Sequence, residues 1–100
     1  MIRRIVKMSF HPDKIDEFLS LFETVKEKIR NSEGCHHLEL LQDQANPSII
    51  FTYSFWLEER YLEQYRYSDL FESTWAKTKK LFNGKPEAWS TRMISTVVEN

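Results

Sequence analysis

Residues 49–56 have the pattern of a β-strand whose two sides are both apolar. The segment reads Ile-Ile-Phe-Thr-Tyr-Ser-Phe-Trp. Successive side chains of a strand point to opposite faces of its sheet. One face would therefore carry Ile49, Phe51, Tyr53 and Phe55, and the other Ile50, Thr52, Ser54 and Trp56. Neither set reads as a solvated surface, so a chain built around this strand must cover both faces of its sheet.

The composition predicts one globular domain over residues 1–100. Of these residues, 41% are hydrophobic and 29% are charged, as in ordinary globular proteins. The 14 basic and 15 acidic residues give a net charge of −1, so we expect neither nucleic acid nor a membrane surface as partner. The basic pairs Arg3-Arg4 and Lys79-Lys80 are expected to be solvated rather than to bind anions.

The cysteine content and the N-terminus favour a cytoplasmic protein. Cys35 is the one cysteine of the chain, which excludes an intramolecular disulfide and fits a reducing compartment. The opening residues, 1–7, carry charges but no apolar stretch behind them. They resemble neither a signal peptide nor a transmembrane span, which needs roughly 20 apolar residues.

Hydrophobic periodicity predicts six elements. Strands are expected over 2–10, 35–43, 49–56 and about 89–98, a helix over about 15–30, and helical structure over 57–82 in two pieces. Ile15, Phe18, Phe22, Val25 and Ile29 recur at helical spacing in the first helix. Ser68-Asp69 supplies a new N-cap inside the second helical segment and so divides it.

This β-α-β-β-α-β order predicts an α+β, ferredoxin-like fold with a four-stranded antiparallel sheet. Right-handed crossovers place both helical segments on one face of that sheet. The other apolar face remains uncovered by the chain. We therefore expect a homodimer through the sheet face.

A set of landmarks resembles the antibiotic biosynthesis monooxygenase (ABM) superfamily of dimeric α/β barrels over essentially the whole chain. The landmarks, in order, are Phe10-His11-Pro12-Asp13-Lys14, Glu33-Gly34-Cys35, Asp43 with Asn46-Pro47, Tyr53 with Trp56, and Ser68-Asp69-Leu70-Phe71. Members of this superfamily include cofactor-free oxygenases of polycyclic phenols, haem-degrading enzymes and signal-molecule processors. The resemblance thus implies a fold more firmly than a reaction.

Departures from the family pattern limit the chemistry that the resemblance implies. Many relatives carry a histidine where this chain has Tyr65, and a second one near Leu70. The haem-degrading branch uses an Asn, a Trp and an iron-binding His, which fall on or near Lys7, Tyr65 and Trp75. An indole offers no free ring lone pair for iron. Haem degradation is therefore disfavoured, and no cofactor is expected.

The run Cys35-His36-His37 contains metal-ligating residue types at an unsuitable spacing. Adjacent strand residues point to opposite faces, so the two histidines would not share an ion, and no metal site is expected. One histidine should face the helices, where a pKa of about 6.5 suits a general base. A one-residue shift in register exchanges their faces, so both remain candidates, and a packed or interface histidine is the alternative.

The expected ligand cleft lies between the second helical segment and the sheet. Tyr53, Tyr65, Trp75 and Phe22 are candidates for its lining, and Lys7 for stabilising an anion. A cofactor-free oxygenase needs a base, donors for the developing anion and a dry aromatic slot, because the ionised substrate supplies the electrons. Aromatic residues at helical spacing also fit an ordinary core.

Two functions therefore remain open from the sequence. The first is a cofactor-independent ABM-type monooxygenase that acts on a small phenolic or quinone-forming aromatic, with His37 or His36 and Tyr65 as catalytic residues. The second is a non-catalytic homodimer whose cleft binds a small apolar or aromatic ligand. The missing family histidines favour the second function, and the aromatic hydroxyls and indoles favour the first.

Overall fold

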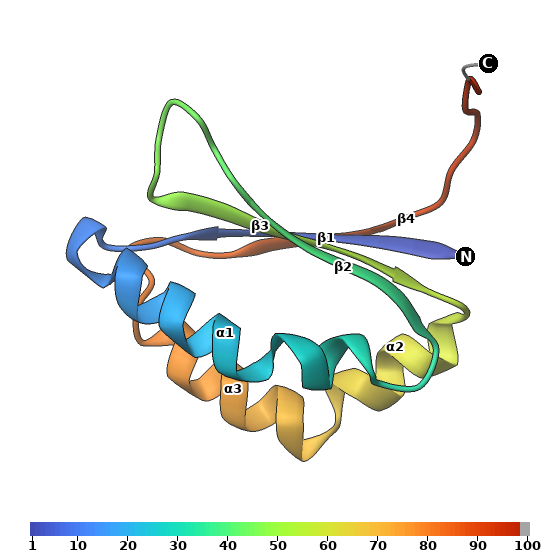
Figure 1. Cartoon of the computed structure of the whole chain (residues 1–100), viewed down its shortest axis with the longest axis horizontal. Coiled ribbons are helices and arrows are strands. Elements are labelled where there is room, and N and C mark those ends of the chain that lie inside the picture. The colour runs from blue at the N-terminus through green and yellow to red at the C-terminus, as the bar shows by residue number, and fades with distance from the viewer. Residues whose placement is uncertain (99–100) are drawn as a thin grey trace.

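The computed structural model describes residues 1–98 as a four-stranded antiparallel sheet with its helices on one face (Figure 1). The sheet order is β2-β3-β1-β4. The elements are β1 Ile2–Ser9, α1 Ile15–Arg30, β2 Cys35–Gln42, β3 Ile49–Trp56, α2 Glu59–Arg66, α3 Asp69–Lys79 and β4 Glu87–Thr91. This confirms the ferredoxin-like α+β fold and the placement of all helices on one side.

The helices begin close to where local signals predict, but α3 ends at Lys79, before the expected end at Phe82. A 3₁₀ turn over Pro12–Lys14 leads into α1, whose buried side chains are Phe18, Phe22 and Ile29. The break between α2 and α3 falls at Ser68, whose Oγ accepts a hydrogen bond of 3.1 Å from the backbone N–H of Phe71. This N-cap satisfies one of the free N–H groups of α3 and confirms the predicted division of the second helical segment.

The last strand is shorter than expected. β4 covers Glu87–Thr91 instead of 89–98, and residues 92–98 form no regular structure. β4 pairs with β1 from Lys7↔Glu87 to Arg3↔Thr91. Because β1 itself begins at Ile2, the chain beyond Thr91 soon has no strand to pair with. The apolar pattern of residues 93–98 therefore does not form the expected strand.

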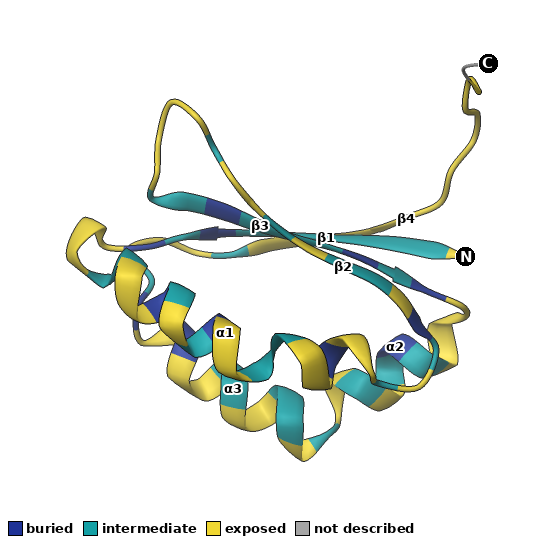
Figure 2. Ribbon diagram, viewed as in Figure 1, coloured by how far each residue is buried: buried dark blue, intermediate teal, exposed yellow. Residues whose placement is uncertain are grey.

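Strand pairing sorts the side chains into two faces. Antiparallel pairs such as Arg4↔Ser54, Val6↔Thr52 and Met8↔Ile50 lie on the helix side. The main core lies there too (Figure 2) and includes Phe10 and Ile50, which are fully buried. The ring of Phe10 stacks on Phe18 of α1 at a centroid distance of 4.4 Å, which fixes the helix against the sheet.

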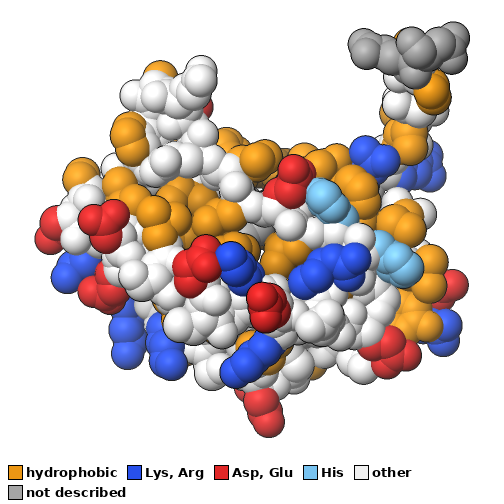
Figure 3. Space-filling model, in the orientation of Figure 1, with side chains coloured by type: hydrophobic (Ala, Val, Ile, Leu, Met, Phe, Trp, Pro, Cys, Tyr) orange, Lys and Arg blue, Asp and Glu red, His pale blue; other side chains and the backbone are white. Residues whose placement is uncertain are grey.

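The other face of the sheet carries an outer apolar patch. By strand register it comprises Ile5, Leu41, Ile49, Phe51, Tyr53, Phe55 and Trp89. Hydrophobic side chains line this side in the space-filling view (Figure 3), opposite the helices. Leu41 and Trp89 are 46% and 44% exposed. The prediction that the chain's own helices cover only one of two apolar faces is thus confirmed.

Gly34 tests how closely the turn before β2 packs on Tyr61 of α2, and Gly84 is the matched control. Gly34 has φ +80°, and an added Cβ would overlap the Cβ and ring of Tyr61. Ala at such φ costs roughly 1–2 kcal/mol before any clash, so we expect Gly34→Ala to lower the free energy of unfolding by about 2 kcal/mol or more. A Cβ on Gly84 would meet only the Cβ of Ser9, at 3.9 Å, so Gly84→Ala should change stability little. Equal urea midpoints for the two variants would contradict this account.

Candidate functional site

A cavity of about 280 Å³ lies between the helix side of the sheet and the helices. α1 packs on β2 and α2 on β3, whereas α3 packs against α1 and α2. This arrangement leaves room above α3, beneath β1 and the start of β4. Residues from every helix and from all four strands line the cavity. It therefore depends on the complete fold and not on one local motif.

One wall of the cavity is a chain of aromatic rings. Trp56 stacks on Tyr65 at a centroid distance of 5.0 Å, and Tyr65 meets Phe71 edge to face at 5.3 Å. Phe71 then stacks on Trp75 at 5.8 Å with an interplanar angle of 12°. Phe22 of α1 contributes a further ring to the lining. These surfaces favour a flat, apolar ligand.

Two polar groups of the lining are satisfied within the protein. The indole N–H of Trp56 donates to Oγ of Ser54 at 2.9 Å. The hydroxyl of Thr78 donates to the carbonyl oxygen of Thr74 at 2.8 Å. Because these donors are already engaged, they hold the walls in place and do not offer a proton to a ligand.

Tyr65 is the phenol of the lining. Burial, and to a lesser degree the neighbouring Cys35, raises the pKa of Tyr65 far above its usual range. Its hydroxyl therefore keeps its proton at physiological pH and acts as a hydrogen-bond donor, not as a base. No side-chain hydrogen bond engages this hydroxyl within residues 1–98, and no buried polar side-chain atom of these residues lacks a partner. The hydroxyl is therefore accessible from the cavity and can donate to a ligand.

Arg4 and Arg66 also line the cavity, although neither is among the site residues predicted from the sequence. Arg4 was expected at a solvated face, and it is intermediate in exposure. Arg4 shares the parity of Ile2, Val6 and Met8 on β1 and so points to the helix side. The alternation of side chains along β1 could have revealed this position from the sequence. An arginine among the apolar residues of one strand face is, however, easily taken for a surface residue.

The structure places the predicted site residues on two opposite faces. Phe22, Tyr65 and Trp75 lie together in the cavity lining. Lys7 and Tyr53 instead project from the outer face, because Lys7 pairs with Phe51 and Tyr53 with Ile5 in the β1–β3 register. The expected cleft positions of Lys7 and Tyr53 are therefore wrong.

Neither histidine of β2 lines the cavity, so the expectation of an inward-facing histidine is also wrong. A β-bulge between Cys35 and His37 inserts His36 as an extra, exposed residue. Cys35 faces inward against Trp56, and His37 consequently pairs with Phe55 on the outer face. Without the bulge, alternation would have turned His37 inward.

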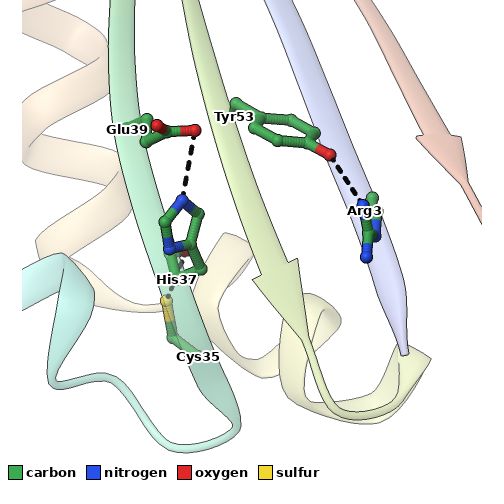
Figure 4. Close-up of polar contacts among 5 residues, drawn as sticks. All are labelled: Arg3, Cys35, His37, Glu39 and Tyr53. Carbon is green, nitrogen blue, oxygen red and sulfur yellow. Dashed lines mark hydrogen bonds and ion pairs between the residues drawn. The ribbon is translucent and has the colours of Figure 1, made fainter. Parts of the chain in front are cut away.

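His37 belongs to a polar and aromatic group on the outer face (Figure 4). Its Nε2 lies 3.1 Å from Oε2 of Glu39, and its ring is 4.7 Å from that of Phe55. Nearby, Arg3 donates to the Tyr53 hydroxyl at 3.2 Å and lies over the ring of Phe55. These contacts give the outer apolar patch a specific polar rim.

Cys35 is part of a small core with Trp56 and Leu62. Burial raises the pKa of its thiol, and a hydrogen bond to the His37 carbonyl and the charge of Arg30 oppose that shift. A buried thiol with a raised pKa is a poor nucleophile, which agrees with its expected structural role.

Two further findings concern the part of the chain that the structure describes. Within residues 1–98, no three His, Cys, Asp or Glu side chains group closely enough to hold a metal ion. The helices of this same part of the chain include none with the length and apolar character needed to cross a membrane.

Solved structures share this fold. A conserved protein from Methanosarcina mazei Go1 superposes with a TM-score of 0.87 at 27% identity, covering 91% of this chain and 90% of that one. A structure described as an antibiotic biosynthesis monooxygenase gives 0.89 at 19% identity, covering 95% and 100%. Rv0793 from Mycobacterium tuberculosis gives 0.86 at 13% identity, covering 97% and 98%.

Sequence comparison supplies the family. A search among curated proteins gave no match. The sequence profile of the family described as antibiotic biosynthesis monooxygenase matches residues 1–77, which include β1 to β3, α1, α2 and most of α3. The chain therefore belongs to the antibiotic biosynthesis monooxygenase family.

Proposed function

We propose that this protein is a monooxygenase that needs no bound cofactor and oxidises a small phenolic aromatic in the cavity. The observation that carries the proposal is the aromatic wall together with the unengaged hydroxyl of Tyr65. Family membership supports the reaction class. The flat space beside Phe71 and Trp75 supports an aromatic substrate.

The proposed reaction converts a phenol with a free para carbon into a quinone. One atom of O₂ becomes the new carbonyl oxygen and the other leaves as water, which carries away the phenol proton and the para hydrogen. Four electrons pass from the substrate to O₂. The ionised phenol is the electron donor, so the protein's task is to favour the anion and exclude water.

Within this scheme Tyr65 is the donor to the substrate oxyanion, and Phe22 and Trp75 hold the ring. The lining contains no histidine, so the proton leaves to solvent or to the oxygen being reduced. Stabilisation of the phenolate then replaces the general base that the sequence predicted at His36 or His37.

The same observation supports a second candidate function. A cavity without a base suits a non-catalytic protein that binds a small aromatic ligand and leaves it unchanged. The two functions differ in one measurement, because a binding protein takes up no oxygen when its ligand is present.

We also propose that a second copy of the chain covers the outer apolar patch and forms a dimeric α/β barrel. Burying one Phe side chain stabilises by about 1.5–3 kcal/mol, and this patch carries Phe51, Phe55 and Trp89 together. Lys7, Tyr53 and His37 would then lie at the subunit interface. The paired polar contacts of this face would set how the copies align.

Removal of the Tyr65 hydroxyl tests the catalytic proposal. Tyr65→Phe keeps the ring that stacks on Trp56 but removes the donor, so oxygen uptake with phenolic substrates should fall by roughly 100-fold, as for loss of one oxyanion donor. Tyr67→Phe is the control, because Tyr67 lies two residues away and is 76% exposed. Uptake should be measured with an oxygen electrode across a panel of phenols and naphthols. No uptake by the wild-type protein on the whole panel would favour the binding function instead.

A charge in the outer apolar patch tests the dimer. Phe51→Lys should convert a dimer of twice the 12.1 kDa chain mass into a monomer, because a buried unpaired ammonium opposes association. Glu72→Lys is the matched control, because Glu72 is an exposed residue of α3. Light scattering coupled to size exclusion measures the mass. A monomeric wild-type protein would contradict the proposed dimer but would not bear on the proposed function of the cavity.

A further inference from the structure

Two arginines from different elements meet at the cavity described above. Arg4 reaches it from the helix side of β1, and Arg66 from the C-terminal residue of α2. The two segments are 62 positions apart in the chain, from 4 to 66, so only the fold brings them together. Arg4 is partly buried, whereas Arg66 is exposed. The proximity of these two like charges needs a physical explanation, because like charges repel and burial disfavours the charge of Arg4.

The two arginines differ in their contacts. Arg4 donates from Nη1 to the Ser90 hydroxyl at 3.0 Å, and no carboxylate of residues 1–98 forms an ion pair with it. Arg66 has a loose contact of 3.7 Å with Glu63. Each guanidinium has five N–H donors, so most donors of Arg4 remain free.

The electrostatic balance at Arg4 agrees with this geometry. Burial, followed by the charge of Arg66, lowers the pKa of Arg4, and Glu59 and Glu63 oppose that shift with smaller effects. Glu87 is a further acidic residue of the lining, but it pairs with Lys7 in the register and so belongs to the outer face.

We propose that Arg4 and Arg66 form an anion-binding subsite, so that the cavity takes a flat aromatic ligand bearing a carboxylate or an ionised phenol. The ring lies along Phe71 and Trp75, and the oxyanion lies between the guanidiniums, which bind planar oxyanions through paired N–H donors. This inference rests on the proposed function for the location of the ligand. It deepens that function by naming the charge that the ligand must carry.

The test compares a charged probe with its neutral analogue on the folded full-length protein. Calorimetry with 2-naphthoate and 2-naphthamide varies the charge while keeping the ring. We expect 2-naphthoate to bind roughly 10- to 100-fold more tightly, the range for hydrogen bonds to charged groups. The second possible oxyanion is a phenolate, and its probe is 4-nitrophenol. This compound ionises near neutral pH with a visible absorbance change, and binding to the cavity should lower its apparent pKa.

Variants assign the effect to the two arginines. Arg4→Gln and Arg66→Gln should each reduce the preference for 2-naphthoate by roughly 10-fold or more, and Arg4→Lys should retain part of it. Arg60→Gln is the matched control, because Arg60 lies exposed on the same helix as Arg66 and pairs with Glu58. If Arg4→Gln does not fold, Arg66→Gln and the comparison of the two probes on the wild-type protein still test the anion-binding subsite.

The outcomes separate this inference from the proposed function. Equal affinity for 2-naphthoate and 2-naphthamide overturns the anion subsite but leaves the aromatic cavity and its oxygenase or binding role standing. A preference for 2-naphthoate that survives both glutamine variants also overturns the assignment to Arg4 and Arg66. Binding of neither naphthalene probe nor 4-nitrophenol overturns the subsite and the proposed function together.

Discussion

The antiparallel pairing of β1 with β3 is the contact on which the rest of the molecule depends. These two central strands join Ile2↔Trp56 through Ser9↔Ile49 without a shift in register. The pairing sends one parity of each strand to the helices and the other to the outer face, and it does so for both strands at once. A shift by one residue would exchange the core of Met8 and Ile50 for the outer apolar patch. The cavity, the helices and the proposed dimer surface therefore all follow from one ladder of backbone hydrogen bonds.

The two faces then acquire different tasks because the chain covers only one of them. On the helix side, α1 and α2 pack closely on β2 and β3, and α3 stands away from β1 and β4, which leaves the cavity. On the other side, apolar rings remain at the surface beside the Arg3–Tyr53 and His37–Glu39 contacts. In the proposed function the first face binds a ligand and the second binds another copy. The division explains why so small a chain carries so many aromatic side chains.

The chemistry that the cavity favours is stabilisation of an anion more than removal of a proton. Tyr65 is held neutral by burial and can donate, whereas the histidines lie elsewhere. In the proposed anion subsite, Arg4 and Arg66 bind the ionised oxygen of the ligand. A substrate whose oxygen acid ionises readily would need no strong base in such a site, since a nearby guanidinium lowers the free energy of the charged form. The two proposals thus share one physical basis but fail in different experiments.

The sequence alone determined the element order, the helix break at Ser68 and the ferredoxin-like topology, because each is written in local periodicity and capping. It also determined that both sheet faces are apolar, since the alternation of residues 49–56 is independent of context. Tertiary structure decided which face each side chain takes. The bulge at His36 turned His37 to the outer face, and the strand register placed Lys7 outside and Arg4 inside. A bulge adds a single residue that no periodicity reveals, and the meeting of Arg4 with Arg66 requires the packing of α2 against the sheet. The local pattern therefore fixed what the chain folds into, and the long-range pairing fixed which residues form its site.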